Sequence, residues 1–389
     1  MSTFNCRSLL FVAACSPALA APPTDQYQTV GVVDDLPVFY RQVESRTHHP
    51  LSWLSGHYTD FAAWRRMARD KYFSCLLDRP PSVQWDAVVI GEQDRGNYVA
   101  RKVVFNLTGD SRVLAYLTVP KGPGPFPAVL LLHDHGAKFD IGKEKVIRPW
   151  GIASEKMTSA QKWVDENYGG RYLGDTLAQR GYVCFATDAL NWSDRGGGGY
   201  DGQQKLASNL MHLGMSLAGL MAWEDLQAAE FLSQQPEVDP RHIAAMGWSM
   251  GAFRAWQVAA LSDHIAAAVA DCWMCTTDHL MVPGNNQTRG SSSYNMLHPG
   301  LLADLDFPDL ASIACPKPLM LFNGLQDKLF PPDGVRAAYA KMHAVWKSQD
   351  ADSRLVTRLW SVKHTFNAEM QDVAFAWLDQ VLAAPEKSK

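Results

Sequence analysis

From residue 86 onward, short apolar runs alternate with segments of helical periodicity. Residues 128–132 read Ala-Val-Leu-Leu-Leu, and a continuous apolar run is typical of a strand buried on both faces of a parallel sheet. Eight other short segments predict strands: 87–90, 100–106, 113–119, 182–187, 243–246, 265–270, 318–322 and 354–360. Helical patterns lie around 172–180, 217–232, 253–261 and 368–381. This alternation predicts an α/β fold, with a mostly parallel central sheet flanked by helices.

The first 85 residues have a different pattern. Residues 36–78 carry helical periodicity with many aromatic side chains, and Pro80-Pro81 ends this segment because proline cannot continue a helix. We therefore predict three regions. They are a signal peptide over 1–20, a linker and N-terminal helical extension over 21–85, and one large α/β domain over 86–389.

Residues 1–20 have the pattern of an export signal. Arg7 supplies a positive charge, a short apolar stretch follows, and Ala18-Leu19-Ala20 makes an A-x-A cleavage motif. A second interpretation competes, since Val12-Ala13-Ala14-Cys15 resembles the lipobox of bacterial lipoproteins, which would place a lipid anchor on Cys15. We expect cleavage after Ala20 and a secreted or periplasmic protein.

Composition excludes several classes of protein. The 389 residues carry 40 acidic and 36 basic side chains, a net charge of −4. This balance does not fit a nucleic-acid-binding protein, which normally has a basic face. No run of about 18 apolar residues follows the N-terminal signal, so we expect no membrane span. A hydrophobic content of 47% with 20% charged residues is typical of a globular chain.

The cysteines leave one local question open. Removal of residues 1–20 would take away Cys6 and Cys15 and leave 7 − 2 = 5 cysteines. Two of these, Cys272 and Cys275, have C-x-x-C spacing, but no second pair completes a zinc site. We expect either a local disulfide between them or two buried thiols.

The strongest chemical signal is Gly247-Trp248-Ser249-Met250-Gly251. It lies between the predicted strand 243–246 and the predicted helix 253–261. In this context a G-x-S-x-G pattern predicts a sharp turn that exposes the serine hydroxyl at the edge of the sheet. A serine hydroxyl becomes a good nucleophile when a base removes its proton. Ser249 is therefore the candidate nucleophile.

The chain also supplies a base and an acid in the order Ser–Asp–His. His364 follows the last predicted strand and is the candidate base. Asp327 follows the penultimate strand and is the candidate acid that would orient the imidazole. Asp271, at the end of a strand, and Asp278, in the loop beyond it, are the alternatives for this acid.

Acyl transfer needs hydrogen-bond donors for the developing oxyanion, and each is worth about 3–4 kcal/mol. We expect one from the backbone N–H of Met250, the residue after the candidate nucleophile. The other is expected from His133-Asp134-His135-Gly136, as the N–H of His135, with that of Ala137 as the alternative. Because a catalytic zinc needs three protein ligands and no third is evident beside the two histidines, we expect no metal and no cofactor.

Three long connections follow predicted strands: residues 137–165, 189–213 and 272–305. Ligands of open α/β sheets bind at the carboxyl ends of the strands, so we expect these connections to border the site. Trp192, Trp248 and Trp273 lie in or beside them and are candidates to stack on a sugar, with burial in the core as the alternative.

These residues resemble the α/β-hydrolase superfamily over about residues 86–385. Within it, the chain is similar to the dienelactone-hydrolase-like and acetyl xylan esterase-like branch of secreted bacterial hydrolases. The similarity rests on His133–Gly136 followed by Gly142-Lys143-Glu144, on Arg180-Gly181-Tyr182 and on Asp194-Arg195-Gly196.

Two departures from that branch matter. Dienelactone hydrolases have a cysteine nucleophile where this chain has Ser249, and the branch usually has His-Gly where this chain has His133-Asp134. With a serine, the resemblance implies a secreted serine esterase that acts on acetyl or other short acyl esters, on a small molecule or a polysaccharide. A serine peptidase of the prolyl-oligopeptidase type and a binding protein that has lost catalysis are the alternatives. The complete set of Ser249, Asp327 and His364 favours catalysis.

Overall fold

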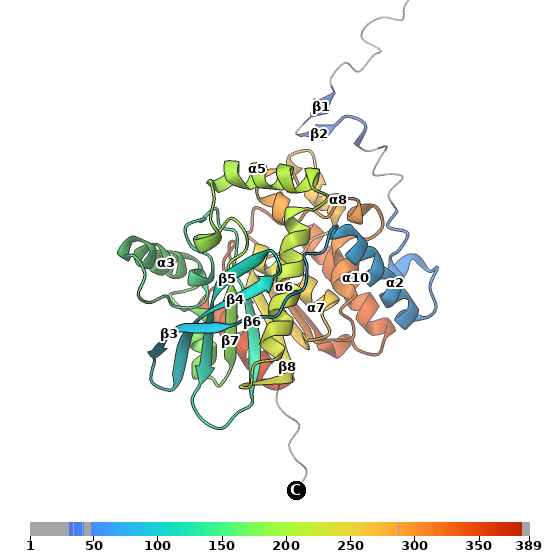
Figure 1. Ribbon diagram of the computed structural model, residues 1–389. Helices are drawn as coiled ribbons and strands as arrows, with labels where there is room; N and C mark the ends of the chain where they lie inside the picture. The colour runs from blue at the N-terminus through green and yellow to red at the C-terminus, as the bar shows by residue number, and fades with distance from the viewer. Residues whose placement is uncertain (1–30, 34, 41, 43–47, 287, 383–389) are drawn as a thin grey trace, which may run out of the picture.

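The computed structural model describes residues 31–33, 35–40, 42, 48–286 and 288–382 (Figure 1). The predicted signal peptide at 1–20, with the alternative lipid anchor at Cys15, lies outside the described residues. Within the described part, we find no helix with the length and apolar character needed to span a bilayer.

A nine-stranded sheet forms the centre of the molecule, in the order β13-β12-β9-β8-β6-β7-β5-β4-β3. In chain order its strands are β3 (Val88–Asp94), β4 (Tyr98–Thr108), β5 (Ser111–Pro120), β6 (Phe126–Leu132), β7 (Val183–Thr187), β8 (Val238–Trp248), β9 (Ala267–Asp271), β12 (Leu319–Gly324) and β13 (Leu355–Trp360). In the order of the sheet, every neighbouring pair from β13 to β7 is parallel. The remaining pairs, β7 with β5, β5 with β4 and β4 with β3, are antiparallel. All nine predicted strands are present, so the prediction of a mostly parallel sheet is confirmed.

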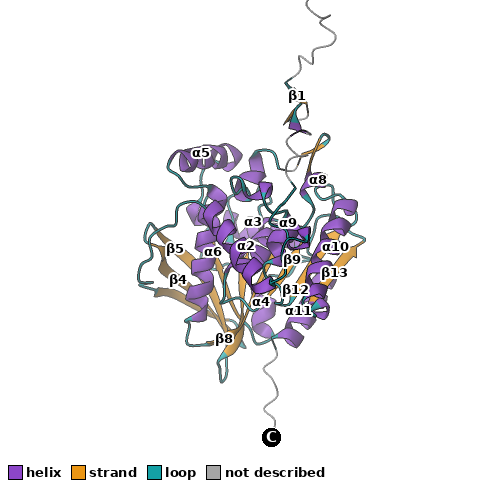
Figure 2. Cartoon of the chain, turned by 90° about the vertical axis from the view of Figure 1, so that its right-hand side faces the viewer, coloured by secondary structure: helices purple, strands orange, loops and turns teal. Residues whose placement is uncertain are grey.

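Helices cover both faces of this sheet (Figure 2). One face packs against α2 (Phe61–Cys75), α6 (Leu217–Ser233), α7 (Met250–Leu261), α9 (Phe307–Ser312) and α10 (Pro332–Ser348), and the other against α3 (Ser154–Asn167), α4 (Leu173–Gln179) and α11 (Ala368–Val381). Strand β6 shows why the run of residues 128–132 is continuously apolar. Leu130 and Leu132 belong to one core and Val129 and Leu131 to the other, because successive side chains of a strand point to opposite faces.

The N-terminal helix is shorter than predicted. Of residues 36–78, α2 takes only Phe61–Cys75, and it begins at Asp60 because that side chain accepts a hydrogen bond from the N–H of Ala63. Trp64 and Tyr72 are buried in the core beside α7 and α10, so this helix packs on the α/β domain (Figure 1). The described residues before it form short elements: β1 (Val32–Val33), β2 (Leu36–Pro37) and η2 (Trp53–Ser55).

Two of the three predicted long loops contain helices. The connection 137–165 carries most of α3, and the connection 189–213 carries α5 (Gly199–His212), which lies at the upper edge of the main body in Figure 1, below β1 and β2. Neither helix has a side-chain N-cap, and α5 begins in a run of glycines, so the usual start signals are missing from the sequence. In its described residues, the third connection contains no element longer than five residues.

Candidate active site

Ser249 lies in a sharp turn between β8 and α7. Its backbone has φ 56° and ψ −124°, a sparsely populated conformation that costs about 1–3 kcal/mol. The flanking glycines permit it. A Cβ on Gly247 would lie 2.3 Å from the backbone of Gly251, and a Cβ on Gly251 would lie 2.0 Å from the carbonyl oxygen of Leu132. Both distances are far too short for carbon contacts, so the turn requires glycine at both positions.

The turn is anchored to the neighbouring strand. The N–H of Ser249 donates to the carbonyl oxygen of Asp271 at 2.8 Å, and Asp271 is the last residue of β9. Because β8 and β9 are parallel, this bond places Ser249 at the edge of the sheet where the carboxyl ends of the strands meet. Ligands of open α/β sheets bind at this edge.

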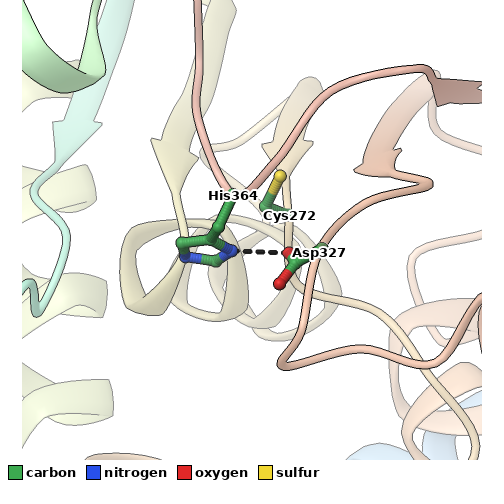
Figure 3. Close-up of side chains that lie close together, drawn as sticks. All are labelled: Cys272, Asp327 and His364. Carbon is green, nitrogen blue, oxygen red and sulfur yellow. Dashed lines mark hydrogen bonds and ion pairs between the residues drawn. The ribbon is translucent and has the colours of Figure 1, made fainter.

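His364 and Asp327 are in direct contact (Figure 3). Nδ1 of the imidazole lies 2.6 Å from Oδ2 of the carboxylate. The side chain of Asp327 is fully buried, and its other oxygen accepts a hydrogen bond from the N–H of Leu329 at 2.9 Å. The imidazole remains 21% exposed. With Nδ1 bound to a carboxylate, Nε2 is the nitrogen left to exchange a proton with a substrate.

Backbone contacts hold the loops after β12 and β13 together. The N–H of Leu325 donates to the carbonyl oxygen of Trp360 at 2.7 Å. A Cβ on Gly324 would lie only 2.5 Å from the carbonyl oxygen of Val362, so the backbones of the two loops pass each other closely at this glycine. The approach fixes the relative position of the two loops that carry the candidate acid and the candidate base.

The two alternative acids, Asp271 and Asp278, have different surroundings from Asp327. Asp271 is fully buried, and burial raises the pKa of its carboxyl well above the usual range. Its Oδ1 accepts from the thiol of Cys272 at 3.5 Å, and no described group bonds to its Oδ2. The side chain of Asp278 is 64% exposed and pairs with His279. In the described part of the chain, neither carboxyl forms a hydrogen bond with His364.

A cavity of about 600 Å³ opens beside these residues. Ser249, Met250 and His364 all line it, so the structure brings the candidate nucleophile and base to one space. The other lining residues come from the end of β8 and from the connections that follow β6, β7, β9 and β12, including their helices α3, α5 and α9. They are His135, Gly136, Ala137, Trp163, Asn167, Tyr200, Trp248, Trp273, Leu280, Met281, Thr288, Ser292, Ser293, Met296, Leu297, His298, Pro299, Gly300, Leu301, Leu302, Ala303, Phe307, Leu310, Leu329 and Phe330.

The three candidate tryptophans, Trp192, Trp248 and Trp273, differ in their position relative to the cavity. Trp248 lines the cavity with its ring centroid 4.9 Å from that of His364, and Trp273 lines it against Phe307. Trp192 does not line the cavity. It is fully buried, stacks on Phe139 and donates from Nε1 to the carbonyl oxygen of His135 at 3.2 Å. Of the two alternatives given for Trp192, stacking on a sugar or burial in the core, the described structure has the buried indole, which supports the His133–Gly136 loop.

Two further aromatic residues line the cavity that the sequence pattern does not single out. Trp163 comes from α3 and Tyr200 from α5, and both line the cavity. Neither residue stands out in the sequence, because both helices lie in connections that lack the usual helix start signals. An amphipathic pattern within those connections was the available signal for finding them.

The candidate oxyanion donors lie at the same edge. Met250 is the first residue of α7, and N–H groups of the first helical turn have no partner within the helix. The N–H of Ala137 already donates to Nδ1 of His135 at 3.0 Å, whereas no described group accepts from the N–H of His135. Burial lowers the pKa of the His135 side chain to about 4, although its hydrogen bond with Gln203 opposes this shift. The ring is therefore neutral at pH 7.

Asp134 explains why this loop departs from the usual His-Gly. Its Oδ2 accepts hydrogen bonds from the hydroxyl of Tyr168 at 2.9 Å and from Nε1 of Trp163 at 3.2 Å. The fully buried ammonium of Lys145 donates to the carbonyl oxygens of Asp134 and His135 at 2.8 and 3.0 Å. The carboxylate thus ties the loop to α3.

Among the residues that the structure describes, two groups of side chains have the composition of metal ligands, but neither fits a metal centre. Glu144, Asp188 and Asp194 surround the ammonium of Lys143, which lies 2.7 and 2.6 Å from the two aspartates. The other group joins Cys272 to the bonded Asp327–His364 pair (Figure 3). Burial raises the pKa of the Cys272 thiol well above its usual range, and a protonated thiol is a poor ligand.

The C-x-x-C segment holds two separate thiols. Cys272 and Cys275 are both buried and are not joined by a disulfide. Of the two alternatives from the sequence, the structure therefore has the buried thiols. Neither thiol lines the cavity beside Ser249.

The sheet, the serine turn and the site at the carboxyl edge define an α/β-hydrolase. More narrowly, the chain belongs to the Abhydrolase family, whose model matches residues 47–351. The matched region includes α2, so the N-terminal helix is part of the family unit. The resemblance to the α/β-hydrolase superfamily is confirmed by this match.

Similar proteins carry hydrolase and esterase names. The chain is 27% identical over 288 residues to "Putative hydrolase YtaP" of Bacillus subtilis (strain 168). That alignment covers 74% of this chain and 89% of that protein. The structure of this chain is similar to that of a "putative acetyl xylan esterase" from Bacteroides fragilis NCTC 9343 (TM-score 0.68, 17% identity, 83% of this chain and 81% of that chain). It is also similar to that of a glucuronoyl esterase from Solibacter usitatus (TM-score 0.62, 12% identity, 86% and 97%). At these identities, the structural likeness establishes the fold.

Proposed function

We propose that this protein is a serine esterase that uses Ser249, His364 and Asp327. The observation that carries the proposal is the 2.6 Å contact between His364 and Asp327 at the rim of the cavity that Ser249 also lines. The strained turn at Ser249 adds support, because a half-buried serine that lines the cavity and lies between two obligatory glycines suits a nucleophile.

In the proposed reaction, Oγ of Ser249 attacks the ester carbonyl carbon while Nε2 of His364 takes the hydroxyl proton. The N–H groups of His135 and Met250 stabilise the negative charge on the carbonyl oxygen. The ester C–O bond then breaks, and His364 gives the proton to the departing alcohol. Water, activated by the same imidazole, attacks the acyl-enzyme and releases the acid and Ser249. Asp327 keeps the ring oriented and stabilises its charged form.

The proposed substrate is a carboxylic ester of a carbohydrate. The two structurally similar proteins named above carry carbohydrate-esterase names, and aromatic faces of Trp163, Tyr200 and Trp248 line the cavity. Flat apolar faces suit stacking on sugar rings. The sequence resemblance implies an acetyl or another short acyl group, and the cavity is much larger than an acetyl group needs.

Turnover of three substrates tests this proposal: p-nitrophenyl acetate, acetylated xylan and a prolyl anilide. Ester turnover is expected, and Ser249→Ala should lower it by about 10³-fold or more. The matched control is Ser361→Ala, because Ser361 is exposed and does not line the cavity. Cleavage of the anilide alone would instead identify a peptidase, and turnover that is unchanged in Ser249→Ala would overturn the proposal.

We also propose that the chain is exported and cleaved after Ala20. The support is the pattern of residues 1–20 in the sequence. Expression in a bacterial host followed by N-terminal sequencing of the exported protein should find Ala21 first. An N-terminus at a lipidated Cys15 would replace this proposal with the lipoprotein alternative.

A further inference from the structure

The connection after β9 supplies six apolar side chains to the cavity, which we call the aliphatic wall: Leu280, Met281, Met296, Leu297, Leu301 and Leu302. The same connection also contributes the polar Thr288, Ser292, Ser293 and His298 to the lining. At the mouth, the apolar character continues. Tyr200, Leu297 and Leu329 line the cavity and are still 45%, 42% and 39% exposed. Exposed apolar residues gathered at one place mark a binding surface for apolar ligands.

The cavity carries no charged side chain of the Lys, Arg, Asp or Glu type among its described lining residues. Two of its histidines are neutral at pH 7, since burial lowers the pKa of His298 to about 3 and that of His135 to about 4. An ionised group placed against the aliphatic wall would find no counter-charge, and an unpaired buried charge is strongly unfavourable. The wall therefore suits a neutral group.

The size of the cavity also argues against a very small group. Cavities of about 300–1,000 Å³ bury ligands of drug size, and this one measures about 600 Å³. An acetyl group has a single methyl group to place against the wall. It would leave most of the aliphatic surface in contact with water.

The sheet order places Ser249 between two different walls. Strand β8, which leads to Ser249, lies between β6 and β9. The loop after β6 carries His135 and packs with Trp163, whereas the connection after β9 supplies the aliphatic wall. An ester bond at Ser249 can therefore have its polar sugar part on one side and an apolar part on the other.

We propose that the aliphatic wall after β9 binds the acyl group, and that the preferred substrates are neutral esters whose acyl chain is longer than acetyl, such as hexanoyl or octanoyl. This inference rests on the proposed esterase function. It replaces the short acyl group that the sequence resemblance implies. Each methylene buried against the wall contributes about 0.8 kcal/mol, which corresponds to about fourfold in kcat/KM.

A series of p-nitrophenyl esters from acetate to octanoate, below their micellar concentrations, tests the proposal. We expect kcat/KM to rise by about fourfold per methylene from acetate to hexanoate. A maximum at acetate, with lower values for longer chains, would overturn it. The variant Ser249→Ala distinguishes a failure of this inference from a failure of the proposed esterase function. If turnover requires Ser249 but acetate is the best substrate, this inference fails and the proposed function stands, whereas turnover without Ser249 removes both.

A substitution that introduces a charge at the aliphatic wall provides a second test of the proposed acyl site. Leu297→Asp places a carboxylate at the exposed rim, where folding tolerates it, and should lower kcat/KM for hexanoate by about tenfold while acetate changes by less than about threefold. Leu213→Asp is the matched control, because Leu213 is 73% exposed and does not line the cavity. An equal loss on all esters in Leu297→Asp would contradict an acyl site at this wall.

Discussion

The α-carbon of Gly251 lies so close to Leu132 that a Cβ on Gly251 would be 2.0 Å from the Leu132 carbonyl oxygen. Gly251 is in the first turn of α7, and Leu132 ends β6, directly before the His133–Gly136 loop. This one close approach brings the turn that carries Ser249 against the loop that carries the candidate oxyanion donor. The serine turn and this loop are thus positioned as one unit.

Gly251→Ala should therefore destabilise the fold. The backbone must move to admit the methyl group, and overpacking of this kind costs about 1–3 kcal/mol or more. Urea unfolding measures the change. The control is Gly91→Ala in β3, where the nearest atom to a new Cβ is the Lys102 side chain at 3.9 Å. The change there should stay within about 0.5 kcal/mol, and equal effects at both sites would contradict the close approach.

The choice of acid predicts a contrast between two isosteric variants. Asp327→Asn removes the charge that orients His364 and should lower kcat by about 10³–10⁴-fold. Asp271→Asn should change kcat by less than about tenfold, because burial raises the pKa of Asp271 well above its usual range and an amide resembles a protonated carboxyl. The measurement is kcat on p-nitrophenyl acetate. A larger loss in Asp271→Asn than in Asp327→Asn would assign the acid to Asp271.

His298 predicts a loss of stability in acid. Burial lowers its pKa to about 3, whereas the unfolded chain takes up a proton near pH 6.5. The unfolded state therefore binds more protons between these values, and the free energy of unfolding falls as the pH is lowered through this window, by at most about 1.4 kcal/mol per pH unit.

Urea unfolding at several pH values in wild type and in His298→Gln checks this expectation. The glutamine retains an N–H donor toward Gln257, which accepts from Nε2 of His298 at 2.6 Å in the wild type. The variant should show a smaller slope of stability against pH below pH 6.5. His57→Gln, at an exposed histidine, should keep the wild-type slope. If the slope is unchanged in His298→Gln, the buried imidazole is not the cause.

Trp163 and Trp192 both donate a hydrogen bond to the His133–Gly136 loop, and they should respond differently to substitution. Trp192→Leu should lower the free energy of unfolding by about 3 kcal/mol, since Trp192 is fully buried and stacks on Phe139. Trp163→Leu should have the smaller effect on unfolding and should lower kcat/KM on acetylated xylan, because Trp163 lines the cavity. Urea unfolding and xylan ester turnover together test the pair, and the reverse pattern would contradict the placement of both indoles.

The sequence alone determined the α/β class, the nine strands of the sheet and the place of Ser249 between a strand and a helix. These features depend on local patterns, because a buried parallel strand must be apolar on both faces and a sharp turn of this kind needs its glycines. The chain order of Ser249, Asp327 and His364 also followed from local position, since each comes after a strand of the sheet.

Only the tertiary structure decided which acid meets the imidazole, that Trp192 is buried, that Trp163 and Tyr200 line the cavity, and that an aliphatic wall lies beside Ser249. Such facts depend on the order in which strands assemble and on how connections pack over the edge of the sheet. Residues hundreds of positions apart become neighbours there, and hydrophobic periodicity, which acts over a few residues, does not encode their distances.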